Sequence, residues 1–116
     1  MDGAVMNRPD SLSSTTWRAA GPDIRVGSVA RVEAGSAFWQ LWITFGAGFG
    51  LRRAVVRPAA RYRPDALPGS RVCAVVNPPL PPSSPTDVIV LGMTEPGGGM
   101  ILICPDQCVA DGGKLF

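Results

Sequence analysis

The chain has 116 residues, of which 14 are glycine and 12 proline, and a formal net charge of only +2. This length predicts one domain with a modest core, and the glycine and proline content favours short strands and turns over helices. The sequence contains no histidine, which excludes Ser-His-Asp and Cys-His catalytic arrangements and imidazole metal ligands.

Residues 1–16 are rich in Ser, Thr, Asp and Asn and show no hydrophobic periodicity. We expect a flexible arm there and a folded domain over residues 17–116. The arm lacks the basic and apolar runs of a secretory signal, no window is long enough to span a membrane, and three cysteines make no disulfide framework. These features predict a cytoplasmic protein that does not bind membranes.

The first half of the domain alternates between apolar and polar residues, as strands do. Residues 24–33 predict a half-buried strand, and residues 38–45 predict a second one. The apolar face of the second strand, which we assign to the core, carries Trp39, Leu41, Ile43 and Phe45. Its other face carries Phe38, Gln40, Trp42 and Thr44, which is unusually aromatic for a solvent-facing surface. A glycine-rich hairpin turn at 46–50 leads to a third strand at 51–57.

The second half begins at 63–69, which predicts one helical turn or a tight loop stopped by Pro68 and Gly69. Residues 72–77 predict an apolar strand in which Cys73 is a buried core residue. Five prolines between 78 and 85 predict a stiff, extended loop. Residues 87–93 predict another buried strand, 95–99 a glycine turn, 100–104 a short strand and 114–116 a last edge.

These elements predict an all-β fold of six or so short strands, closed into a small barrel. The OB-fold, a small Greek-key β-barrel, is the leading member of that class. We expect it here with a short helical turn between the third and fourth strands and with terminal extensions.

The chain from about Asp23 onward resembles the CsaA-like branch of the tRNA-binding-domain family. The matching segments begin with Asp-Ile-Arg-Val-Gly at 23–27 and continue in order through 32–33, 45–46, 50–53, Tyr62, 64–67 with Gly69, 74–79, 88–92, 97–99 and 105–106. The resemblance implies an OB-fold homodimer that binds tRNA or unfolded polypeptide, some members being described as secretion chaperones.

The chain departs from the family at several polar positions. Residues 54–57 read Ala-Val-Val-Arg where the family carries a Ser- and Gln-containing stretch, and the loop after Asn77 lacks the family's basic residues. Each lost phosphate contact weakens nucleic-acid binding and its salt dependence. The sequence therefore predicts a divergent member with a more apolar binding wall.

We predict a ligand surface made of Phe38, Gln40, Trp42, Arg53, Arg57, Asn77 and Asp87. Phe38 and Trp42 would stack on bases, and Arg53 and Arg57 would meet phosphate. Asn77 and Asp87 flank the proline-rich loop, where they would position a polar group. Five arginines, at 52, 53, 57, 61 and 63, form a cluster that either attracts anions or guards a solvated strand edge.

Other interpretations of this surface stay open. The aromatic strip could bind unfolded polypeptide or form the seam of a dimer. It could instead line an apolar pocket for a hydrophobic small molecule, in a specialised-metabolism enzyme of the cyclase or isomerase type. The sequence assigns no catalytic residue and no cofactor. Cys104 and Cys108, with the distant Cys73, provide too few ligands for a zinc site.

Overall fold

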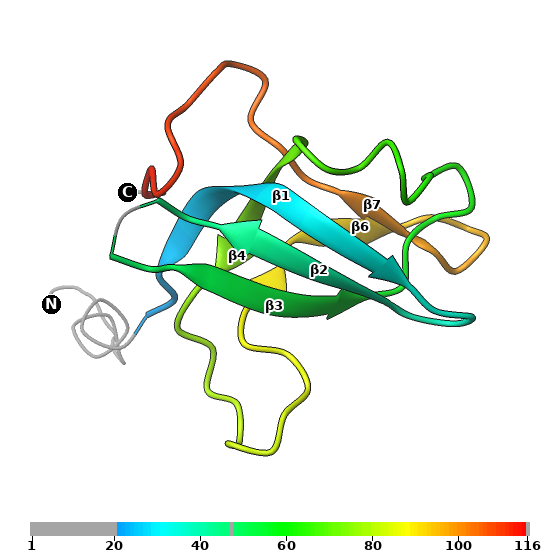
Figure 1. The fold of residues 1–116 in the computed structure, drawn as a ribbon, viewed down its shortest axis with the longest axis horizontal. Helices are drawn as coiled ribbons and strands as arrows, with labels where there is room; N and C mark the ends of the chain where they lie inside the picture. Colours follow the sequence, from blue (N-terminus) through cyan, green and yellow to red (C-terminus); the bar gives the residue numbers. More distant parts are fainter. Residues whose placement is uncertain (1–20, 47, 116) are drawn as a thin grey trace, which may run out of the picture.

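The protein is described here by a computed structural model that places residues 21–46 and 48–115. The arm predicted over residues 1–16 lies outside these ranges. The described residues form seven strands and no helix (Figure 1). The strands are β1 (Ile24–Ala34), β2 (Trp39–Thr44), β3 (Leu51–Val56), β4 (Arg71–Val75), β5 (Ile89–Val90), β6 (Gly92–Thr94) and β7 (Met100–Leu102).

Five strands form one antiparallel sheet in the order β3-β2-β1-β4-β5, and β6 pairs with β7 in a second, two-stranded sheet. The large sheet curls until β5 contacts β3. The residues just before β5 complete this closure, because the backbone N–H of Asp87 donates to the carbonyl of Arg53 at 2.7 Å. The result is a nearly closed five-stranded barrel of the OB type, which confirms the predicted fold class.

The core fills the barrel with the inward side chains of the five strands of the large sheet. On β2, Leu41 and Ile43 are fully buried, and Phe45 follows directly after the strand with 1% exposure. The remaining buried apolar residues of this core are Val29, Ala54, Val56, Leu67, Val72, Ala74, Val88 and Val90. The prediction that the face of Trp39, Leu41, Ile43 and Phe45 points to the core is confirmed, with Trp39 half-buried at its end.

A β-bulge in β1 changes which residues face the core. Val29 pairs with Ile43 while Arg31 pairs with Trp42, so two steps along β1 correspond to one step along β2. The side-chain alternation therefore reverses at this point, since one extra residue shifts every later side chain to the opposite face. Val29 is buried and Arg31 is exposed, although strict alternation along residues 24–33 had placed them on the same face.

Two segments differ in form from the expectations. Residues 63–69 make hydrogen-bonded turns, with the N–H of Ala66 donating to the carbonyl of Arg63 at 3.1 Å, so the tight loop and not the helical turn is found. The single buried strand predicted over 87–93 is wrong. The strand is interrupted at Leu91. The N–H of Leu91 donates to the Cys73 carbonyl at 2.8 Å, and its carbonyl accepts the N–H of Ile103 at 3.1 Å. The strand changes partner there, from β4 to the β7 side.

The C-terminal segment returns to the beginning of β1 (Figure 1). There it adds a short edge to the sheet, at the position where the sequence predicted one. Lys114 forms a bridge with Arg25, and the N–H of Leu115 donates to the carbonyl of Ile24 at 2.8 Å. The Ser28 hydroxyl also binds the Asp111 carboxylate at 2.7 Å. Among the residues that the structure places, no helix has the length and apolarity that a membrane span requires.

Candidate nucleic-acid interface

The outward-facing side of β1, β2 and β3, called here the outer face, carries a row of two arginines and one tryptophan. Arg31 and Arg53 are the direct cross-strand neighbours of Trp42 on either side. The Arg31 guanidinium lies over the indole ring, 3.7 Å from its centroid, which is a favourable cation–π geometry. Trp42 therefore points away from the barrel interior and is flanked by positive charge on both neighbouring strands.

The next outward positions along β2 are Gln40 and Phe38. The Gln40 amide lies 3.4 Å from the Glu33 carboxylate across the strand pair. Phe38, just before β2, is 57% exposed, so its ring is open to a ligand. The structure thus brings Phe38, Gln40, Trp42 and Arg53 to one surface, where the sequence had placed them.

The members of the arginine cluster differ in whether their side chains have a hydrogen-bond or ion-pair partner. Arg52 donates to the Phe49 carbonyl at 2.8 Å, Arg61 pairs with Glu95 at 3.0 Å and Arg63 pairs with Asp65 at 3.4 Å. In contrast, no carboxylate pairs with Arg53 or Arg57 within residues 21–46 and 48–115. Arg57 is exposed beyond the end of β3, so these two arginines are the members of the cluster best placed for a phosphate.

Asn77 and Asp87 have local roles in the fold. The Asn77 side chain accepts the N–H of Asp23 at 2.7 Å and donates to the Gly21 carbonyl at 3.3 Å, so it fastens the chain leading into β1. It lies beside the start of β1, while the Trp42 row lies near the end of that strand. Asp87 accepts the N–H of Arg53 at 3.1 Å. Both side chains use their polar atoms on the backbone.

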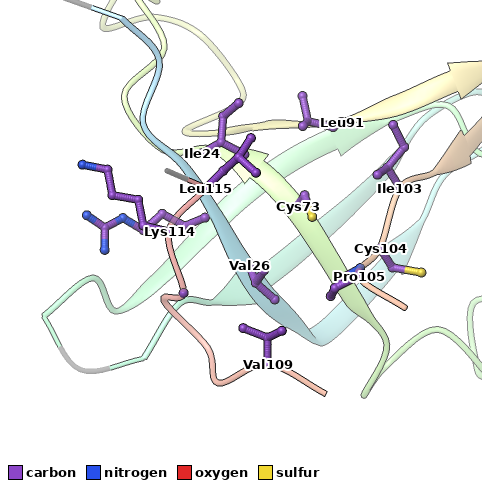
Figure 2. Close-up of a pocket in the computed structure, with 12 residues that line it drawn as sticks. Ile24, Val26, Cys73, Leu91, Ile103, Cys104, Pro105, Val109, Lys114 and Leu115 are labelled. Carbon is purple, nitrogen blue, oxygen red and sulfur yellow. The ribbon is translucent and has the colours of Figure 1, made fainter. Parts of the chain in front are cut away.

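An apolar cavity of about 440 Å³ lies on another part of the molecule. Its walls come from the start of β1, from the residues after β7 and from the C-terminal segment (Figure 2). They include Val26, Leu91, Ile103, Val109 and Leu115. Trp42 is not among the lining residues, so this cavity does not coincide with the pocket that the sequence suggested beside Trp42.

Cys73 lines this apolar cavity (Figure 2). The prediction of a buried core cysteine is wrong, because Val72 and Ala74 take the inward positions of β4 and Cys73 points outward between them. Partial burial, and secondarily the nearby Cys104 thiol, raise the pKa of the Cys73 thiol above its ordinary value. Cys104 and Cys108 are exposed free thiols, and the described residues hold no group of three or more Cys, Asp or Glu side chains that could bind a metal.

Solved structures share this barrel over nearly the whole chain. The chaperone CsaA from Bacillus anthracis superimposes with a TM-score of 0.74 and 27% identity, over 92% of this chain and 98% of that one. The CsaA chaperone protein from Picrophilus torridus gives 0.70 and 26%, over 92% and 99%. The chain is thus similar to the CsaA chaperones in both sequence and fold.

A third structure, a MetRS-related protein from Pyrococcus horikoshii, has a TM-score of 0.68 and 22% identity over 96% of this chain and all of that one. At that identity the likeness concerns the fold. No protein-family model matches the sequence. The family expectation drawn from the ordered segments is confirmed by the two CsaA structures.

Sequence reasoning missed one residue of the outer face of this CsaA-like protein. Arg31 is the nearest cation to Trp42, but the regular alternation of β1 assigns it to the same face as Val29. The sequence carries no signal for this change, because only the structure shows the bulge between Val29 and Arg31 and the exposure of Ala30 within it. A bulge depends on the pairing with β2, and the β1 sequence alone does not specify that pairing.

Proposed function

We propose that this CsaA-like protein binds RNA through unpaired nucleotides, with tRNA as the first class to test. The observation that carries the proposal is the Arg31–Trp42–Arg53 row across three strands. OB-folds bind nucleic acid on the corresponding strands, and a base stacked on an aromatic ring contributes about 1–3 kcal/mol. Arginines on both sides of the ring provide donors for the phosphates next to that base.

Arg31 has the freedom that such a contact needs. Its side chain is 58% exposed, and its ion pair with Glu33 is long, at 3.8 Å, so it holds the guanidinium only weakly. On binding, the guanidinium moves from the indole to a phosphate and a base takes its place on the ring. Phe38 offers a second stacking surface along the same side of β2.

The experiment is fluorescence anisotropy with labelled tRNA and a single-stranded oligonucleotide at about 50 and about 200 mM salt. We expect Arg31→Gln and Arg53→Gln each to weaken binding several-fold and to lower the salt slope by about 1, as loss of one phosphate contact does. Arg63→Gln is the matched control, because Arg63 is exposed and pairs with its own neighbour Asp65. Absence of binding at the lower salt, or an equal loss in the control, would refute the proposal.

A second proposal concerns the apolar cavity, which we infer to be covered by a second copy of the chain. Ile103, Val109 and Leu115 around it are 40%, 36% and 51% exposed, an apolar grouping that a small domain gains stability by burying. The C-terminal segment that forms one wall is anchored on β1, so the surface is prearranged. Unfolded polypeptide is the competing occupant, since two of the structural relatives are named chaperones.

Sedimentation equilibrium of the wild type and of Val109→Asp decides between these occupants. A dimer that Val109→Asp converts to a monomer supports self-association, with Leu51→Asp as the control because Leu51 is 59% exposed and does not line the cavity. A wild-type monomer refutes it. In that case, protection of a denatured test protein from aggregation that Val109→Asp abolishes would assign the cavity to polypeptide.

A further inference from the structure

A separate hollow of about 350 Å³ lies at the end of the barrel, where β2 begins and β3 has just ended. Trp39 pairs with Val56 at this end of the two strands, so the residues before β2 and those after β3 face each other. The hollow, called here the end pocket, is lined by Ser36, Trp39, Arg57, Tyr62 and the alanines and proline between them. Its volume lies within the range of about 300–1,000 Å³ typical of small-ligand sites.

The wall after β3 is held rigidly by hydrogen bonds. The Tyr62 hydroxyl accepts the N–H of Leu102 at 2.9 Å, and the Tyr62 N–H donates to the Ala59 carbonyl at 3.1 Å. Ala59 is itself tied to β7, because its N–H donates to the Met100 carbonyl at 3.0 Å. The position of the Tyr62 ring is therefore set before any ligand arrives, which reduces the ordering cost of binding.

The opposite wall is also fixed. Trp39 packs against the core, and a tight turn leads into it, with the Gly35 N–H donating to the Phe38 carbonyl at 3.0 Å. The end pocket thus presents two aromatic residues that are half-buried and anchored at their inner edges. Planar rings stack readily on such surfaces.

The rim of the end pocket provides positive charge. Arg57 is exposed and makes no ion pair or side-chain hydrogen bond within the described part of the chain. The neighbouring Arg61, in contrast, is bound to Glu95 at 3.0 Å. A free guanidinium beside two aromatic rings suits a ligand that joins a planar ring to an anion.

We propose that the end pocket binds one unpaired nucleotide, with its base against Trp39 and Tyr62 and its phosphate on Arg57. This inference rests on the proposed RNA-binding function and extends it from the outer face to a second subsite at the end of the barrel. Phe38 connects the two, because it is exposed, precedes Trp39 directly and shares the side of Trp42 by the two-residue period of a strand. An RNA strand that follows β2 past Phe38 reaches the rim of the end pocket.

The test uses free mononucleotides, so that it does not depend on RNA binding at the outer face. The chain contains three tryptophans, whose indole N–H signals are resolved by ¹⁵N NMR, and Trp39→Phe identifies the Trp39 signal. Adenosine and uridine 5′-monophosphates are titrated, with adenosine alone and inorganic phosphate alone as partial ligands. We expect saturable shifts of the Trp39 signal with the nucleotides. Adenosine alone and inorganic phosphate alone should each bind at least about tenfold more weakly.

Arg57→Gln is expected to weaken nucleotide binding at least about tenfold, as loss of a charge-assisted contact does. Arg63→Gln, which removes an exposed arginine that does not line the end pocket, should leave it unchanged. Two results overturn the inference, namely a Trp39 signal that does not move and an equal effect of the two arginine substitutions.

The two proposals fail in distinguishable ways. Trp42→Ala should weaken oligonucleotide binding while leaving the mononucleotide response at Trp39 intact. If tRNA and oligonucleotides do not bind but mononucleotides shift Trp39, the outer-face function is wrong and the end pocket stands. If RNA binds with the predicted salt slope but mononucleotides do not shift the Trp39 signal, only the proposal of nucleotide binding in the end pocket is refuted.

Discussion

The hydroxyl of Tyr62 accepts the backbone N–H of Leu102 at 2.9 Å, across 40 residues of sequence. This contact ties the loop after β3 to β7. Removal of the hydroxyl would leave the Leu102 N–H without its hydrogen-bond partner. Tyr62→Phe keeps the ring and its packing, so we expect a loss of about 1–2 kcal/mol in the free energy of unfolding.

Urea denaturation measures this loss as a lower midpoint with an unchanged slope. An unchanged midpoint would mean that water replaces the hydroxyl without cost. Because the Tyr62 ring stays in place, the same variant should retain mononucleotide binding in the end pocket.

Gly99 is required by a close backbone approach. A Cβ atom at this position would lie 2.4 Å from the Cα atom of Ala59 and 3.0 Å from the carbonyl oxygen of Pro58. Since both neighbours are backbone atoms, Gly99→Ala forces the β7 hairpin away from the loop after β3. We expect a loss of at least about 2 kcal/mol in unfolding free energy.

Gly97→Ala is the matched control in the same turn, because a Cβ there would meet nothing within 4 Å. Its effect should stay within about 0.5 kcal/mol. Equal unfolding midpoints for the two alanine variants would show that the Gly99 contact relaxes freely.

Thr86 closes the edge of β3 with its side chain. Its hydroxyl donates to the Val88 carbonyl at 2.6 Å and accepts the N–H of Val55 at 3.3 Å. Thr86→Val preserves the shape of the side chain but leaves the Val55 amide unpaired, at a cost of about 1–2 kcal/mol. Amide hydrogen exchange should therefore become faster at Val55, while Ser83→Ala, in the exposed part of the same loop, should not change it. Protection of Val55 that persists in Thr86→Val would contradict this role.

Much of the barrel follows from local sequence. The two-residue period of β2 correctly assigns Leu41 and Ile43 to the core and Trp42 to the outside. The reason is that successive side chains of a strand point to opposite faces of the sheet. The same period places Phe38 and Gln40 beside Trp42. For that reason the outer face could be predicted in advance, apart from Arg31.

The errors occurred where pairing with another segment decides the outcome. The bulge that exposes Arg31 exists only in the register of β1 with β2. The break at Leu91 arises because its backbone groups bind Cys73 on one side and Ile103 on the other. Asn77 looked like a ligand residue because it flanks the proline-rich loop, yet its amide is used to hold the chain before β1. Each of these partners lies outside the element whose residue pattern was used for the prediction.

Ionisation of Cys73 is expected to lower the free energy of unfolding at alkaline pH. Burial, and secondarily the Cys104 thiol, raise its pKa above the ordinary value of 9.0, so the folded state holds the Cys73 proton more tightly than the unfolded chain does. The resulting stabilisation is complete below that ordinary value and is lost as the pH rises through the raised pKa. Unfolding free energy of the wild type should thus decline more steeply above pH 9.0 than that of Cys73→Ala.

Denaturant unfolding at stepwise increasing pH measures the two slopes, and the other titrating groups are common to both proteins, so their contributions cancel in the comparison. Cys108→Ala serves as the control, because Cys108 is exposed and does not line the apolar cavity; it should follow the wild type at every pH. Parallel curves for the wild type and Cys73→Ala would show that the Cys73 thiolate is as well solvated in the folded protein as in the unfolded chain. That result would also argue that the apolar cavity is open to water around the sulfur atom.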